Sequence, residues 1–519
     1  MIRLESYVRD QWVAGAGKPA VLVNPATEAP MAEASSDGVD FGAMLEHARQ
    51  VGGPALRKLS FAERGALLKA MSRALHGHRE ALLDLGQQNN GGTRGDAKFD
   101  VDGATGTLAA YAQLGEQLGD RSFLLDGDEI VLGRGARFVG QHVRLPRPGA
   151  AVHINAFNFP AWGTFEKVAV AILAGMPVIT KPATATALLA WQMVKIVVEE
   201  VALPAGALQF VAGSLGDLLD QLGPTDVVAF TGSADTASRL RAGPAFTARS
   251  ARFNAEADSL NAAVLGPDVG PGDNLWSLAV RNIVTDMTQK TGQKCTAVRR
   301  IFVPAARLDE LREAISFELG RVRVGDPLTD GVTMGPVATA NQLRDVRAGI
   351  ELLATECAVA TGGSAPLEGA GAPEGRGYYV RPTLLIARDP ASASKVHQHE
   401  VFGPCATLIA TDGSADQAAQ GVARGQGSLV SAVYSDDRAW LGDALLQLAP
   451  YNGRVLVASD KVADSTTAPG MVLPTLLHGG PGRAGGGEEL GGARGMDLYT
   501  QRVAIQGDTG LLKRLLGKA

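Results

Sequence analysis

Residues 150–233 alternate short apolar runs with longer helical stretches, and this pattern constrains the fold more than any other feature of the chain. Four runs have strand length: Ala151–Ile154, Pro177–Thr180, Leu208–Val211 and Val227–Phe230. Helical stretches at Phe165–Ala174 and Ala187–Val201 separate them. Alternating strands and helices predict a parallel sheet covered by helices. Such sheets bind ligands at the carboxyl ends of their strands.

A second α/β region is predicted from about residue 258 to 480. It begins with a strand at Ala262–Leu265, continues with an amphipathic helix, and reaches another strand at Arg300–Val303. Residues 479–495 are rich in glycine and are predicted to form a loop at the rim of a pocket. The fold class is therefore α/β with two sheet-containing units.

A hairpin is predicted from Glu129–Leu132 and Phe138–Arg144, and an isolated strand is predicted near the end of the chain at residues 498–506. A two-stranded hairpin is only marginally stable by itself. We therefore expect this arm to pair with another subunit, giving a homodimer or a dimer of dimers.

Composition excludes several classes of protein. The 519 residues carry a net charge of -5 and no long basic run, which argues against nucleic acid as a partner. The N-terminus has no export signal, and the longest apolar stretch, Val168–Thr180, is too short to span a membrane. Three cysteines in so long a chain form no disulfide framework. We expect a cytoplasmic protein.

Cys295 is the candidate nucleophile. A segment with apolar residues at helical spacing, Trp276 to Met287, leads towards it, and Gly292 offers the left-handed residue that ends a helix. Lys294 is its neighbour, and a nearby cation favours the thiolate form of a cysteine. The sequence predicts a reactive thiol on a short loop after a buried helix.

Considered one at a time, the other candidate polar residues do not indicate a particular function. Asn158 and Lys181 follow predicted strands, where they could simply form turns, and Glu256 could be a solvated charge. His397 and His399 have no third ligand nearby in sequence, so no metal site is predicted.

Taken together in their order along the chain, six segments resemble the aldehyde dehydrogenase superfamily over nearly the whole length. They are Asn158–Pro160, Lys181–Ala183, Phe230–Ser233, Glu256, Gly292–Cys295 and Glu400–Pro404. The resemblance implies a Rossmann-type cofactor domain, an α/β catalytic domain and a small β arm for oligomerisation. The expected boundaries are 1–126 with 146–257 for the first, 258–480 for the second, and 127–145 with 496–510 for the arm.

The resemblance also implies a catalytic role for each of several residues. Cys295 would attack an aldehyde carbonyl, Asn158 and the backbone N–H of Cys295 would stabilise the oxyanion, and Glu256 would activate the water that hydrolyses the thioester. Glu489 matches a second family carboxylate that relays protons or gates the base, although it could equally be a solvated loop charge. His478 either lines the substrate tunnel or has a structural role.

The predicted cofactor is NADP, with NAD weaker. Lys181 would reach the adenosine ribose or its phosphate, and Ser233 opens a helix whose N-terminus favours the pyrophosphate. Many NAD-preferring relatives carry Glu three residues after the lysine, where this chain has Thr184, which can donate to a 2′-phosphate. Glu400 would hold the nicotinamide ribose. The other residues predicted to contact the cofactor are Ile154, Gly213, Phe230, Gly232 and Phe402.

Two longer segments, Gly292–Arg300 and His478–Gly492, are similar to one branch of the superfamily. That branch includes the dehydrogenase half of the ring-opening enzyme of phenylacetate breakdown and the stand-alone semialdehyde dehydrogenase of aerobic benzoyl-CoA oxidation. The chain ends soon after the dehydrogenase region, so the stand-alone type is expected. The implied substrate is a CoA-linked semialdehyde such as 3,4-dehydroadipyl-CoA semialdehyde, oxidised to the acid in benzoate degradation.

Three alternatives stay open from the sequence. The first is a CoA-acylating dehydrogenase, which Glu256 disfavours because relatives that transfer the acyl group to coenzyme A generally lack this base. The second is a dehydrogenase for general medium- or long-chain aldehydes. The third is a non-enzymatic, crystallin-like protein, which the joint presence of Cys295, Glu256 and Asn158 disfavours.

Overall fold

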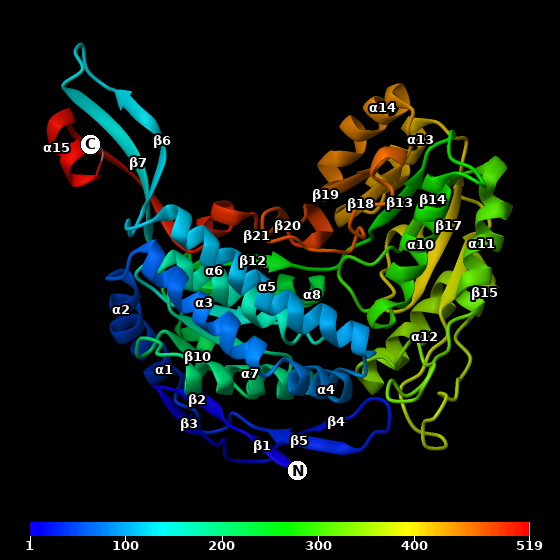
Figure 1. Ribbon diagram of the computed structural model, residues 1–519, viewed down its shortest axis with the longest axis horizontal. Helices are drawn as coiled ribbons and strands as arrows, with labels where there is room; N and C mark the ends of the chain where they lie inside the picture. The colour runs from blue at the N-terminus through cyan, green and yellow to red at the C-terminus, as the bar shows by residue number, and fades with distance from the viewer. Residues whose placement is uncertain (518–519) are drawn as a thin grey trace.

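Two seven-stranded sheets form the body of the molecule, and a three-stranded arm projects from one end (Figure 1). This computed structural model describes residues 1–517. The α/β class and the parallel sheets expected from the sequence are confirmed. The domain boundaries themselves stay a prediction.

The first sheet has the strand order β12-β11-β8-β9-β10-β2-β3, and its first five strands are parallel. The strands are β12 (Arg252–Glu256), β11 (Val227–Thr231), β8 (Ala151–Ile154), β9 (Val178–Lys181), β10 (Leu208–Phe210), β2 (Ser6–Val8) and β3 (Gln11–Val13). The four strands predicted between residues 150 and 233 are confirmed to within one residue at each end. The antiparallel edge strands β2 and β3 were not predicted, because three-residue strands carry too little periodic signal.

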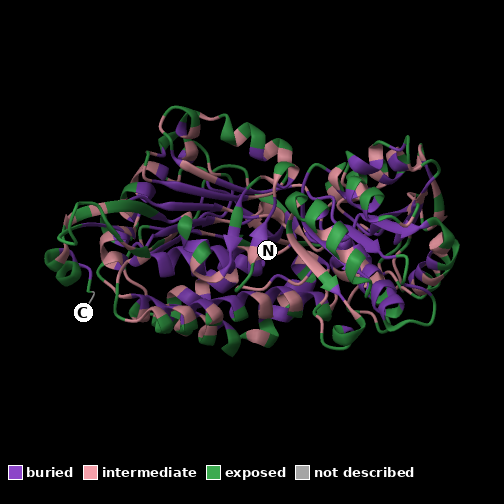
Figure 2. Ribbon diagram, turned by 90° about the horizontal axis from the view of Figure 1, so that it is seen from above, coloured by how far each residue is buried: buried purple, intermediate pink, exposed green. Residues whose placement is uncertain are grey.

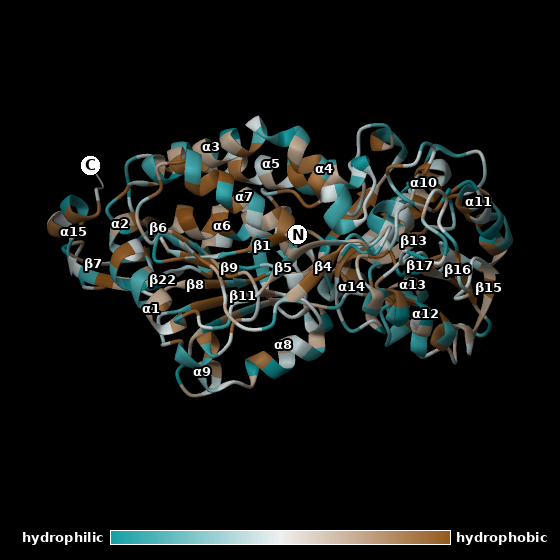
Figure 3. Ribbon diagram, turned by 90° about the horizontal axis from the view of Figure 1, so that it is seen from below, coloured by the Kyte–Doolittle hydropathy of each residue, from teal (hydrophilic) through white to brown (hydrophobic). Residues whose placement is uncertain are grey.

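Helices cover both faces of this sheet. Helix α6 (Trp162–Ala174) begins three residues earlier than predicted, and it is buried along most of its length because α3 (Phe61–Gly77) and α5 (Arg94–Leu118) cover its outer side. Figure 3 shows α6 as largely hydrophobic, between the sheet and these outer helices. The other helices of this unit are α1 (Phe41–His47), α2 (Gly53–Arg57), α4 (Arg79–Asn90), α7 (Ala187–Glu200), α8 (Ala234–Arg241) and α9 (Pro244–Thr247). A small sheet of β1 (Ile2–Leu4), β5 (Pro30–Ala34) and β4 (Ala20–Val23) completes it.

The second sheet has the order β15-β16-β17-β14-β13-β18-β19, and only β15 is antiparallel to its neighbour. Its strands are β15 (Cys357–Thr361), β16 (Thr383–Ala387), β17 (Cys405–Thr411), β14 (Arg300–Pro304), β13 (Ala262–Leu265), β18 (Ser428–Tyr434) and β19 (Asn452–Ala458). Its helices are α10 (Asn274–Thr288), α11 (Leu308–Gly320), α12 (Ala340–Ala354), α13 (Ala415–Ala423) and α14 (Arg438–Leu448). Figure 2 shows the central strands of both main sheets as buried and the arm as largely exposed.

A short hairpin of β20 (Leu477–Gly479) and β21 (Glu488–Leu490) links the two units. It follows the last strand of the second sheet, and its loop bonds to the first sheet through Gly487 N to Ala255 O (3.1 Å) and Ala257 N to Ala484 O (3.0 Å). The glycine-rich segment 479–495 therefore contains a strand and 3-10 helices and is not a loop throughout, although several of its residues line a cavity.

The arm consists of β6 (Leu124–Val131), β7 (Phe138–Pro146) and β22 (Thr500–Asp508), followed by α15 (Thr509–Leu515). The predicted hairpin and late strand are thus confirmed, and they pair with each other. One edge of β22 and one edge of β6 have no partner strand within residues 1–517. Apolar side chains on the arm, Phe138 and Val503 among them, are exposed.

Candidate active site

The carboxyl edge of the first sheet opens into a cavity of about 480 Å³. Ile154 at the end of β8 pairs in register with Lys181 at the end of β9. Thr231 at the end of β11 pairs with Glu256 at the end of β12. Because these strands are parallel, the four side chains reach the same edge, as the sequence predicted.

Most of the residues predicted to contact a cofactor line this cavity. They are Ile154, Lys181, Phe230, Gly232, Ser233, Glu400 and Phe402. Two are not brought into it. Thr184 follows Ala183, which does line the cavity, and opens a short 3-10 helix. Gly213 packs against Ser36 instead, with φ +142° and no room for a Cβ.

Lys181 places a cation in the cavity. Burial lowers its pKa, and it forms no ion pair with any of the residues the structure describes. A mostly buried ammonium group without an acidic partner favours an anionic or hydroxyl-bearing ligand. Ser233 caps the N-terminus of α8 and lines the same cavity as Lys181. This part of the site therefore suits the phosphates and ribose of a dinucleotide.

Glu400 also lines the cavity, and burial raises its pKa to about 7 in spite of Arg299. The Arg299 Nε donates to Glu400 Oε1 at 3.2 Å. The same guanidinium donates to the carbonyl oxygens of Gly292 (3.0 Å) and Lys294 (3.2 Å). Arg299 therefore ties the cofactor cavity to the loop that carries the nucleophile, a role that the sequence analysis missed.

Cys295 lies on the loop after α10, as predicted. Lys290, Thr291 and Gly292 all adopt left-handed conformations there, and a Cβ on Gly292 would lie 2.2 Å from the carbonyl oxygen of Gly403. The thiol is partly exposed and lines two adjoining cavities. The expectation about Lys294 is wrong, because its Nζ binds Asp286 Oδ1 at 2.8 Å, which neutralises the cation.

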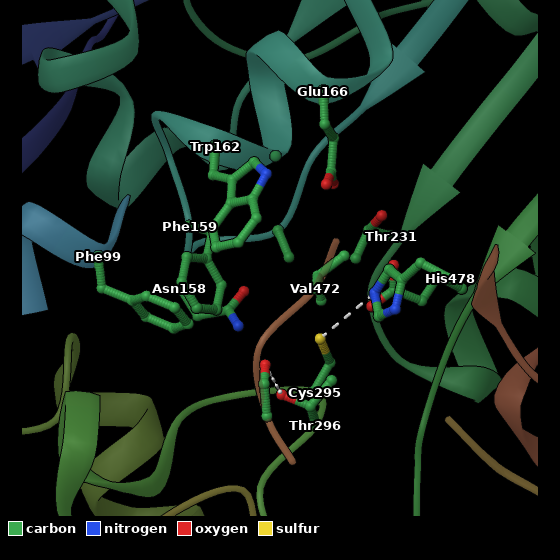
Figure 4. Close-up of a pocket in the computed structure, with 14 residues that line it drawn as sticks. Phe99, Asn158, Phe159, Trp162, Glu166, Thr231, Cys295, Thr296, Val472 and His478 are labelled. Carbon is green, nitrogen blue, oxygen red and sulfur yellow. Dashed lines mark hydrogen bonds and ion pairs between the residues drawn. The ribbon is translucent and has the colours of Figure 1, made fainter. Parts of the chain in front are cut away.

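The second cavity is narrow, about 40 Å³, and mainly apolar (Figure 4). Its apolar walls come from Phe99, Phe159, Trp162 and Val472. Its polar lining consists of Asn158, Glu166, Thr231, Glu256, Cys295, Thr296 and His478. An apolar channel that ends at a thiol, an amide and a carboxylate suits a reactive group at the end of an aliphatic chain.

Glu256, Cys295 and His478 meet at the bottom of this cavity. Their ligating atoms lie within 4.8 Å of one another. The His478 Nε2 is 3.1 Å from Glu256 Oε2 and 3.9 Å from Cys295 Sγ. Burial opposes the charged form of Glu256, but the charge and hydrogen bond of His478 bring its pKa to about 2.

Asn158 lies beside the thiol loop, where its Nδ2 donates to the Gln293 carbonyl oxygen at 3.0 Å. An amide nitrogen carries two hydrogens, so one remains for a ligand in the cavity. The contact fixes the orientation of the amide relative to Cys295, because Gln293 belongs to the same loop.

Glu489 is buried, with 7% of its surface exposed, and the alternative of a solvated loop charge is wrong. The Lys167 Nζ lies 3.1 Å from Glu489 Oε2 and 3.3 Å from Glu166 Oε1. Burial raises the pKa of Glu166 to about 7. The sequence analysis did not single out Glu166 and Lys167, although two charged residues inside an apolar helix were an available signal.

The two α/β units, the partly exposed thiol and the adjoining large cavity together suit a dehydrogenase. The sequence pattern of the aldehyde dehydrogenase family matches residues 12–505, and the chain belongs to this family. It is accordingly an oxidoreductase that oxidises aldehydes.

Two individual relatives each match more than two thirds of this chain. The chain is 46% identical to the 3,4-dehydroadipyl-CoA semialdehyde dehydrogenase of Aromatoleum evansii, over 92% of this chain and 93% of that protein. It is 30% identical to the alpha-ketoglutaric semialdehyde dehydrogenase of Bacillus subtilis, over 69% of this chain and 70% of that protein.

Solved structures share the fold. Betaine aldehyde dehydrogenase from Staphylococcus aureus in complex with NAD+ has a TM-score of 0.83 at 23% identity, covering 98% of this chain and 95% of that one. 3,6-anhydro-L-galactose dehydrogenase in complex with NAP has a TM-score of 0.84 at 23% identity, covering 97% and 99%. Within residues 1–517, no helix combines the length and the apolar content needed to cross a bilayer.

Proposed function

We propose that this protein oxidises a CoA-linked semialdehyde, of the 3,4-dehydroadipyl-CoA semialdehyde type, to the carboxylic acid with NADP+. The observation that carries the proposal is the position of Cys295 at the junction of a narrow apolar cavity and a dinucleotide-sized cavity. The 46% identical relative from Aromatoleum evansii bears the name of this activity.

The reaction begins at Cys295. The thiolate adds to the aldehyde carbonyl at the end of the apolar cavity and forms a thiohemiacetal. The negative oxygen accepts hydrogen bonds from Asn158 Nδ2 and from the backbone N–H of Cys295. Loss of one such donor typically reduces kcat by about 10²–10³.

Lys181, Ser233 and Glu400 would hold NADP, which would supply the hydride acceptor needed to convert the thiohemiacetal into a thioester on Cys295. Glu256 then takes a proton from a water molecule, and the resulting hydroxide releases the acid and the thiolate. Glu256 Oε1 has no hydrogen-bond partner within the described chain, so it is available for that water. A water-activating carboxylate disfavours the acylating alternative.

NADP fits the phosphate end of the cavity better than NAD does. Lys181 supplies a cation there, and Thr184, which lies just outside the cavity lining, occupies the sequence position at which many NAD-preferring relatives carry a glutamate that would repel a 2′-phosphate. Glu400, which lines the same cavity, would hold the nicotinamide ribose through its hydroxyl groups. We expect kcat/KM to be at least about tenfold higher with NADP+ than with NAD+, equivalent to about 1.4 kcal/mol.

We further propose a cytoplasmic homodimer, or a dimer of dimers, assembled through the arm. The exposed apolar side chains and open strand edges of the arm suit pairing with a second copy. Cys295, Cys357 and Cys405 are free thiols, which suits a reducing compartment.

The substrate assignment is tested by following NADPH formation with a CoA-linked semialdehyde and with a simple aldehyde of the same chain length. We expect the CoA-linked compound to have the higher kcat/KM, with no need for free coenzyme A. Turnover that requires free coenzyme A supports the acylating alternative, and equal kcat/KM values support a general aldehyde dehydrogenase. The Cys295→Ala variant serves as the blank, since it should form no NADPH.

A further inference from the structure

Three side chains that can each bind a metal ion meet at the bottom of the narrow cavity. The carboxylate of Glu256, the thiol of Cys295 and the imidazole of His478 bring their ligand atoms within 4.8 Å of one another. Among the residues that the structure describes, no other three His, Cys, Asp or Glu side chains gather in this way. The three ligands come from segments far apart in the sequence, so no motif of closely spaced ligands marks them there.

The distances between these ligand atoms suit a tetrahedral Zn²⁺ ion. The His478 Nε2 lies 3.1 Å from Glu256 Oε2 and 3.9 Å from Cys295 Sγ, and Figure 4 shows the imidazole and the sulfur facing each other. Ligand atoms around a tetrahedral Zn²⁺ are about 3.3–3.6 Å apart, because its bonds to N, O and S are about 2.0–2.3 Å long. Small rotations of the side chains would therefore place all three atoms around one ion.

We propose that Glu256, Cys295 and His478 form a binding site for Zn²⁺, and that Zn²⁺ bound there inhibits the enzyme reversibly. The ion replaces two protons, since the thiol proton and the Nε2 proton of His478 leave to solvent when the sulfur and the nitrogen become ligands. The bound ion occupies the nucleophile and the water-activating carboxylate together, so neither can react. This inference rests on the proposed function, which assigns those roles to Cys295 and Glu256.

The ligand types and their charges favour Zn²⁺ over harder divalent cations. A thiolate, a carboxylate and a neutral imidazole carry two negative charges, which balance the charge of the ion in a site where Glu256 and His478 are buried. Mg²⁺ and Ca²⁺ prefer oxygen ligands, whereas sulfur and nitrogen ligands suit Zn²⁺. Three protein ligands leave the fourth position of the ion for a water molecule.

The backbone of each ligand is held in place by its surroundings. Glu256 ends β12, an edge strand of the first sheet. The carbonyl oxygen of Cys295 accepts a hydrogen bond from Asn261 Nδ2 at 2.8 Å. His478 is paired with Glu489 in the β20–β21 hairpin. Because the ligands are attached to ordered backbone, little rearrangement is needed to hold an ion.

A metal ion can reach this site from solvent. Cys295 is partly exposed, and both Cys295 and Glu256 line the larger cavity as well as the narrow one. An aldehyde must approach the same sulfur, so Zn²⁺ and the aldehyde should compete for the free enzyme. A chelator that removes the ion should restore activity, since binding alters no covalent bond of the protein other than those to the two displaced protons.

The test is Zn²⁺ binding to the full-length protein in metal-free buffer, measured by competition with a chromogenic chelator. We expect one Zn²⁺ per chain with a Kd below about 1 µM. His478→Gln should weaken binding by at least about 100-fold, because loss of a group that merely orients a metal ligand already costs about 10–100-fold. Cys295→Ala should weaken it to a similar extent.

The matched control is His78→Gln, which removes the histidine of an exposed pair with Glu200 and should leave the Kd for Zn²⁺ unchanged. The thermal midpoint establishes that each variant is folded. A wild-type Kd above about 1 µM, or an unchanged Kd in folded His478→Gln, overturns the proposal.

Co²⁺ in place of Zn²⁺ tests the site even if His478→Gln does not fold. A thiolate-to-Co²⁺ charge-transfer band in the wild type that is lost in Cys295→Ala supports the site. Absence of the band from the wild type, or its persistence in the variant, overturns it.

The inhibitory role is measured separately from binding. One equivalent of Zn²⁺ should abolish NADPH formation by the wild-type enzyme, and EDTA should restore it. Activity that Zn²⁺ leaves unchanged, or that EDTA does not restore, overturns this role. The proposed function is tested by turnover in metal-free buffer, so its failure is distinguishable from a failure of the Zn²⁺ site, whose binding test needs neither substrate nor cofactor.

Discussion

Glu256 and Cys295 act in different halves of the proposed reaction, although their side chains are in contact. The sulfur is needed before the hydride leaves, whereas the carboxylate is needed only when the thioester is hydrolysed. Replacing each residue should therefore stop the reaction at a different stage.

We predict that Glu256→Gln retains a rapid first turnover of NADPH and then stalls. The thioester should accumulate on Cys295, because water is no longer activated, and steady-state turnover should fall by about 10²–10⁴-fold. Stopped-flow measurement of NADPH gives the burst, and intact-mass spectrometry detects the acyl group. An equal loss of the burst and of steady-state turnover contradicts this assignment. The control is Glu488→Gln, which changes an exposed glutamate next to Glu489.

Residues next to predicted strands could be located from the sequence, since a strand end fixes where its polar neighbour lies. Lys181 and Glu256 are of this kind. Contacts between segments far apart in the sequence could not be located in this way. The hydrogen bond of Arg299 to Glu400 and the position of His478 next to Cys295 emerged only from the structure. The neutralisation of Lys294 by Asp286 was missed because the two meet where α10 gives way to an irregular loop.

At the scale of elements, α6 is unusual because it carries charged residues within an otherwise apolar helix. Lys167 has only 3% of its surface exposed and is paired with Glu166 and Glu489. A buried ammonium group needs acidic partners to offset its lost hydration, and the two buried carboxylates need the ammonium group for the same reason.

We predict that Lys167→Met destabilises the fold by about 3–5 kcal/mol, because it leaves two buried carboxylates without a counter-ion. The loss should be smaller near pH 6 than near pH 8. Glu166 has a pKa of about 7, raised above its unfolded value, so its charge destabilises the fold increasingly as pH rises and is removed by protonation below that range.

Urea unfolding at the two pH values measures this effect. Lys195→Met, which removes an exposed lysine from α7, is the control and should change stability by less than about 0.5 kcal/mol. An equally small change in Lys167→Met contradicts the account of the buried cluster.

The strands between residues 150 and 233 were predictable because each has its own apolar run and its own turn residues. The N-terminal 126 residues were not resolved into elements beforehand. Their helices α3 and α5 begin with capping boxes, Ser60 with Glu63 and Thr93 with Asp96, which a search for helix starts would have found. The edge strands β2 and β3 offered no comparable signal.

For the whole molecule, the arm is the main feature that a single chain leaves without an evident partner. Its three strands extend from the body and carry exposed apolar side chains (Figure 1). Exposed apolar surface next to open strand edges is typical of an interface between subunits.

We predict that the double variant Phe138→Asp and Val503→Asp sediments as a monomer, because it places two charges on the apolar surface of the arm. The two side chains are 46% and 38% exposed. Leu446→Asp is the control, since this leucine is 84% exposed on α14 and belongs to a different surface. Sedimentation velocity gives the mass, and an unchanged dimer in the double variant would show that the interface lies elsewhere.

The hairpin that carries His478 and Glu489 is almost the last part of the body to leave the ribosome, yet it bonds to β12 in the first sheet. A growing polypeptide that has reached Cys295 but is shorter than 478 residues lacks the imidazole that lies 3.9 Å from the sulfur. The narrow cavity around the thiol, which Val472 and His478 help to line, is therefore completed only when nearly the whole sequence has been made.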